Sequence, residues 1–167
     1  MPTAVGSVLA FYLFRDLCPG ARVLSAGLER GEWTNDPALA MLAWWGIDAR
    51  GHQPRQLERR LCEDASAVFV MAAPCVRRLL VEHGSDLASK AYLFADPFSW
   101  PESFGGREYT VWDPSFDDRP VRELVCEYAW MRERVLQIRE ALLGGGRPLV
   151  AAAGYLDLLE SVDPRRH

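Results

Sequence analysis

Residues 67–95 read AVFVMAAPCVRRLLVEHGSDLASKAYLFA, and this stretch decides the fold. It opens with a continuous apolar run at residues 67–71, which is typical of a strand buried on both faces. A helix is predicted at residues 74–83, ended by Gly84, and a second short apolar run follows at residues 91–95. A strand, a helix and a strand in this order predict parallel pairing, because the helix returns the chain to the same end of the sheet.

The flanking sequence continues the alternation of helix and strand in both directions. The further predicted elements are a helix at 2–17, a strand at 22–26, a helix at 36–45, a helical turn at 55–61, a loop at 97–118 and a helix at 120–142. This order predicts an α/β sandwich with a parallel sheet.

The composition fits one globular domain. Of the 167 residues, 49% are apolar and 25% are charged, which excludes a disordered chain. The formal net charge of −4 argues against a nucleic-acid partner, because no basic excess is available to neutralise phosphates. Almost all the positive charge is arginine, and Lys90 is the only lysine.

The sequence predicts a cytoplasmic protein without a membrane partner. The apolar run at residues 8–14 is too short to span a bilayer and has neither a basic segment before it nor a cleavage site after it. The cysteines form no CxxC pair and no metal-ligand spacing with the histidines. We therefore expect reduced thiols, no metal and no cofactor. The residues concerned are Cys18, Cys62, Cys75, Cys126, His52, His83 and His167.

Three stretches resemble, in the same order, the low-molecular-weight protein tyrosine phosphatases and their arsenate-reductase relatives. They are PGARVLSAGL at 19–28, Asp36-Pro37 with GIDARGHQPRQL at 46–57, and Val111-Trp112-Asp113-Pro114 before a long helix. Pro2-Thr3-Ala4 resembles the start of the helix that follows the family's phosphate loop. The resemblance covers residues 2 to about 143. It implies a three-layer sandwich with a four-stranded parallel sheet, and a phosphatase-like core at residues 1–143.

The sequence departs from the family at its catalytic loop. The family's chemistry depends on a cysteine, five residues and Arg-Ser just before the first helix, and this sequence begins where that loop should end. Cys126 has Arg132 at the matching distance, but both lie in a predicted helix with no glycine between them. A thiolate nucleophile needs a helix N-terminus and an amide cradle to depress its pKa. We therefore expect no cysteine-dependent activity.

The family's first strand is central in the sheet, so its loss would leave two strand edges without hydrogen-bond partners. The segment PLVAAAG at 148–154 resembles this strand and the start of its loop, with Ala152 at the cysteine position. We predict a circular permutation in which the first strand has moved to the C-terminus. Residues 144–167 would then be a glycine linker and a segment that completes the same domain. The alternative is a C-terminal helix at 148–161 together with a misassigned gene start.

The resemblance makes Asp113 the candidate general acid, against the alternative of a simple Asp-Pro turn. Asp157, beyond the proposed strand, is the candidate second carboxylate. The candidate ligand-binding residues lie at the first helix start, in the aromatic loop and in the new C-terminal loop: Pro2, Thr3, Trp100, Trp112, Gly154 and Tyr155. Trp44 and Trp130 have the spacing of packed helix residues, and His52 matches a family position with a structural role.

Three functions stay open at this point. The first is a non-phosphatase enzyme that uses Asp113 for acid–base chemistry on a small, biosynthetic molecule. The second is a pseudophosphatase, a binding or regulatory module for an anionic or phosphorylated partner. The third is a true phosphatase whose loop precedes Met1. A small-molecule or anionic ligand is expected in each case, and a homodimer is left open.

Overall fold

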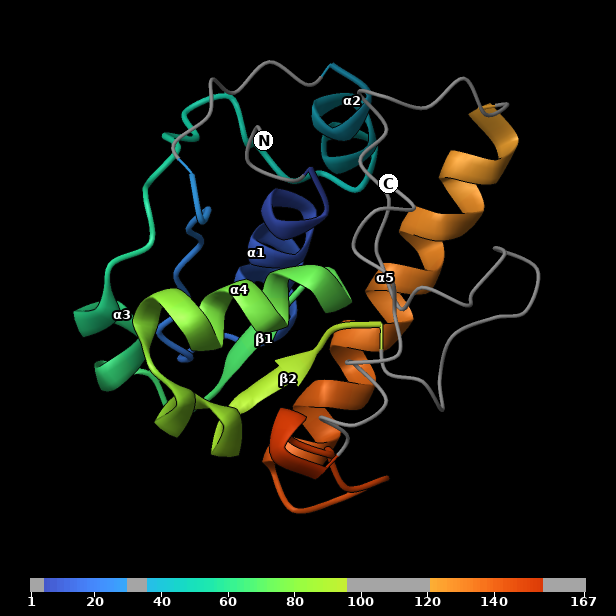
Figure 1. Cartoon of the computed structure of the whole chain (residues 1–167). Coiled ribbons are helices and arrows are strands. Elements are labelled where there is room, and N and C mark those ends of the chain that lie inside the picture. The colour runs from blue at the N-terminus through green and yellow to red at the C-terminus, as the bar shows by residue number, and fades with distance from the viewer. Residues whose placement is uncertain (1–4, 30–35, 96–120, 155–167) are drawn as a thin grey trace. The chain divides into compact units, whose positions relative to one another are not determined.

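The computed structural model describes residues 5–29, 36–95 and 121–154. Its elements are α1 (Val5–Leu17), α2 (Asp36–Trp44), α3 (Arg59–Asp64), β1 (Val68–Val70), α4 (Ala73–His83), the 3₁₀ helix η1 (Ser85–Ser89), β2 (Ala91–Leu93), α5 (Val121–Leu142) and the 3₁₀ helix η4 (Ala152–Gly154) (Figure 1). The two parallel strands β1 and β2 are connected through α4 and η1, which confirms the predicted α/β class.

The described chain forms two compact units. The first contains residues 5–29, 36–56 and 121–148, and the second contains residues 57–95 and 149–154. Each unit has its own packed elements.

In the first unit, α1 packs against α5 and α2. The buried side chains of α1 and α5 recur three and four positions apart, so each helix buries one stripe of its surface. They are Val8, Leu9, Tyr12 and Leu13 on α1, and Tyr128, Met131, Val135 and Ile138 on α5.

The structure corrects the prediction that Trp44 packs in the core. Trp44 is 73% exposed, whereas Ala38 and Leu42 on the same helix are fully buried. Ala38 and Leu42 are four residues apart and share one face of α2. Trp44 follows Leu42 by two positions, which turns its side chain by about 200° around the helix and away from that face. Trp130, by contrast, is half-buried on α5.

In the second unit, β1 and β2 form a parallel pair with Val68 opposite Ala91 and Val70 opposite Leu93. The amide of Val68 donates to the Lys90 carbonyl at 2.8 Å, and the amide of Phe94 donates to the Val70 carbonyl at 2.9 Å. Both strands lie inside the predicted apolar runs at 67–71 and 91–95, and their parallel direction is confirmed.

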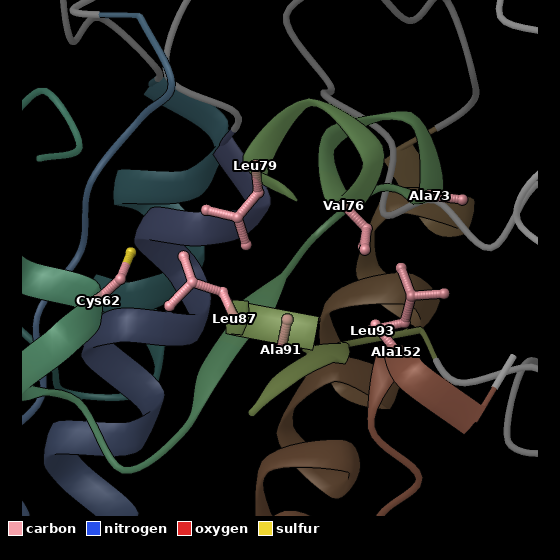
Figure 2. Close-up of a cluster of buried hydrophobic side chains, with 8 residues drawn as sticks. All are labelled: Cys62, Ala73, Val76, Leu79, Leu87, Ala91, Leu93 and Ala152. Carbon is pink, nitrogen blue, oxygen red and sulfur yellow. The ribbon is translucent and has the colours of Figure 1, made fainter. Parts of the chain in front are cut away.

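A cluster of small and branched side chains forms the core of the second unit (Figure 2). Val76 and Leu79 project from one side of α4 towards Leu87 and Leu93. The cluster consists of Cys62, Ala73, Val76, Leu79, Leu87, Ala91, Leu93 and Ala152. Each fully buried leucine contributes about 1.5–3 kcal/mol of transfer free energy, so this cluster fixes α4 and η1 on β2.

Two of the predicted strands are absent from the described residues. Residues 22–26 form no strand, and only an isolated parallel bridge joins Gly27 to Gln56. Residues 148–151 form no helix or strand, and residues 152–154 turn into η4, where the Gly154 amide donates to the Ala151 carbonyl. The strand predicted at 148–153 is therefore wrong, and the circular permutation that depended on it is not supported. The described sheet has two strands where four were predicted.

Candidate functional site

Most of the predicted site lies outside the described residues. This holds for Asp113, Asp157, Pro2, Thr3, Trp100, Trp112 and Tyr155. The predicted first helix is described from Val5. Of the predicted site residues the structure describes Gly154, and it also describes the four cysteines and His52, for which no catalytic role was predicted.

Gly154 ends η4 in the second unit. Its amide N–H is used within the turn, at 2.9 Å from the Ala151 carbonyl. Ala152, the residue aligned with the family's cysteine, is fully buried against Leu93 and its neighbours (Figure 2). A side chain at position 152 therefore faces the core of the second unit.

Three of the four cysteines have thiols that are held protonated. Burial raises the pKa of Cys62, and nearby Lys90 and Arg59 lower it by less. Burial also raises the pKa of Cys75, against a smaller effect of Arg78, and that of Cys18, against a smaller effect of Arg139. A nucleophilic cysteine needs the opposite shift, because the thiolate is the reactive form.

The fourth cysteine, Cys126, is exposed within α5. Arg132 follows it by six positions on the same continuous helix, which separates the two residues by about 9 Å along the axis. The guanidinium of Arg132 lies 3.9 Å from the Glu133 carboxylate. A phosphate loop brings its cysteine and arginine around one anion, and a straight helix does not. The match of Cys126 and Arg132 to the family's spacing is therefore coincidental.

His52 lies in an aromatic cluster of the first unit. Its ring meets Phe11 and Tyr12 of α1 edge-on, with centroids 5.7 Å apart in both cases. The Arg15 guanidinium covers the same two rings, at 5.4 Å from Phe11 and 5.9 Å from Tyr12. Burial lowers the pKa of His52 and so favours its neutral form. These contacts support the structural role predicted for His52.

Arg59 and Lys90, which no sequence motif indicated as functional, bind α3 to its neighbours in the second unit. Arg59 donates to Glu63 at 2.7 Å and to Asp86 at 3.1 Å. The Lys90 ammonium donates to the carbonyls of Glu63 and Ala65, each at 3.0 Å. Lys90, the only lysine, therefore binds the C-terminal end of α3. No local sequence pattern predicts this contact, because the two carbonyls belong to residues about 25 positions before Lys90.

Within residues 5–29, 36–95 and 121–154, no three His, Cys, Asp or Glu side chains come together in a way that would hold a metal ion. No helix in this part of the chain is both long and apolar enough to cross a membrane.

Solved structures with similar folds are tyrosine and arginine phosphatases. A protein described as a protein tyrosine phosphatase has a TM-score of 0.63 at 24% identity, covering 82% of this chain and 87% of its own. The tyrosine phosphatase Wzb from Escherichia coli K30, solved with sulphate, has a TM-score of 0.66 at 16% identity, covering 84% and 94%. The YwlE arginine phosphatase from Geobacillus stearothermophilus has a TM-score of 0.62 at 21% identity, covering 85% and 87%.

These identities establish a shared fold. No match was found among curated proteins. The sequence profile described as low molecular weight phosphotyrosine protein phosphatase matches residues 3–142, which is most of the chain. The chain therefore belongs to the low-molecular-weight phosphotyrosine protein phosphatase family.

Proposed function

We propose that this family member is a non-phosphatase enzyme that carries out acid–base chemistry on a small molecule. The observation that supports the proposal most directly is the state of its cysteines. Burial raises the pKa of Cys18, Cys62 and Cys75, and Cys126 lies within a helix. None of the four is followed by five residues and Arg-Ser. The absence of this motif from the 167 residues supports the proposal.

The residue proposed for the chemistry is Asp113, because Val111-Trp112-Asp113-Pro114 resembles the motif that carries the family's general acid ahead of a long helix. Pro2, Thr3 and Trp112 are proposed to bind the small molecule, with Trp112 excluding water from it. Asp157, Gly154 and Tyr155 were predicted site residues only through the C-terminal strand, which the structure does not form, and they have no role in the proposed site.

An assay with p-nitrophenyl phosphate tests the loss of phosphatase activity. We expect no turnover above the rate in buffer, and no change when all four thiols are alkylated. Turnover that disappears in a single Cys→Ser variant of unchanged fold would overturn the proposal. It would show that the chain is a true phosphatase.

The acid–base role is tested on a substrate found by screening small biosynthetic metabolites for turnover. We expect Asp113→Asn, which keeps the shape of the side chain, to reduce turnover by about a hundredfold or more, the scale of a positioned acid or base. Asp64→Asn, at an exposed residue of α3, is the matched control and should leave turnover unchanged. Equal turnover in both variants would refute the role of Asp113.

A second candidate is a pseudophosphatase that binds an anionic or phosphorylated partner without converting it. The absence of a Cys-x5-Arg-Ser motif in these residues supports it equally. Calorimetric titration with phosphotyrosine separates the two candidates. Binding without turnover of any screened metabolite would favour the binding module.

A further inference from the structure

We draw no further inference here: the strongest candidate, the exposed apolar surface patch that Leu142 and Leu143 form at the C-terminal end of α5, carries none because nothing in the structure shows what covers it.

Discussion

Arg59 occupies the space that a side chain at position 84 would need. Its guanidinium donates to the His83 carbonyl and to Asp86, and a Cβ built on Gly84 would collide with Nη1 of Arg59. Gly84 also has φ of 125°, a conformation that L side chains rarely adopt. The backbone conformation thus requires a glycine at the end of α4, whereas the guanidinium of Arg59 lies at the end of a flexible side chain and can shift aside.

Gly84→Ala is expected to lower the free energy of unfolding by about 1–3 kcal/mol, the scale of a strained backbone position. Urea denaturation followed by circular dichroism measures the effect. Gly51→Ala is the matched control, because a Cβ there meets nothing within 4 Å, and it should change stability by less than about 0.5 kcal/mol. Similar losses of unfolding free energy in the two variants would show that neither the contact with Arg59 nor the backbone conformation of Gly84 disfavours a side chain at position 84.

The cysteines should matter for stability and not for turnover. Cys62 is buried in the core cluster of Figure 2, so Cys62→Ser is expected to cost about 1–3 kcal/mol by placing a hydroxyl among apolar side chains. Cys126→Ser, at an exposed helix position, should be nearly neutral. Thermal unfolding of both variants gives the comparison. A stability loss in Cys126→Ser that matches that of Cys62→Ser would contradict the environments described above.

Stability is expected to fall as the pH is lowered below about 6.5, in part because of His52. Burial holds the folded-state pKa of this imidazole below its value in the unfolded chain. The unfolded state therefore binds the proton first as the pH falls, and the loss is complete only below the folded-state pKa. Urea midpoints at pH 7.5 and 5.5 measure the change.

His52→Gln provides the control for this pH effect. It should flatten the pH dependence between 7.5 and 5.5, whereas His83→Gln, whose histidine is in α4, should retain it. An unchanged slope in His52→Gln would exclude His52 as the source.

On α2, the burial of Leu42 and the exposure of Trp44 predict different losses of stability when each is replaced by alanine. Leu42 is fully buried, so Leu42→Ala is expected to cost about 2–5 kcal/mol of unfolding free energy. Trp44 is mostly exposed, and Trp44→Ala should cost less than about 0.5 kcal/mol. Denaturation of the two variants under the same conditions tests the orientation of the helix. A larger loss of unfolding free energy for Trp44→Ala than for Leu42→Ala would show that α2 buries the face that carries Trp44.

Local signals in the sequence predicted the helices well. The stops at Gly84 and after Leu17 match the ends of α4 and α1, because a helix bonds residues four apart and its capping residues lie beside it. The helical turn expected at 55–61 begins later, as α3 at Arg59–Asp64. Its place depends on Lys90 and Asp86, which lie far along the chain and leave no local pattern.

The candidate site also has one feature that the sequence predicts and one that depends on the tertiary structure. The absence of Cys-x5-Arg-Ser from these residues is a property of the sequence alone. That burial raises the pKa of Cys62 and Cys75 depends on packing, since the surrounding side chains come from several elements.

The sequence by itself determined the α/β class, the family and the positions of α1, α2, α4, α5, β1 and β2. Only the tertiary structure decided which apolar runs become strands. Residues 22–26 and 148–153 have strand-like sequences, yet within the described residues the first forms no ladder and the second turns into η4. A helix satisfies its backbone from within, whereas a strand exists only where another segment supplies hydrogen bonds. That partner is set by long-range packing, which no local stretch of sequence contains.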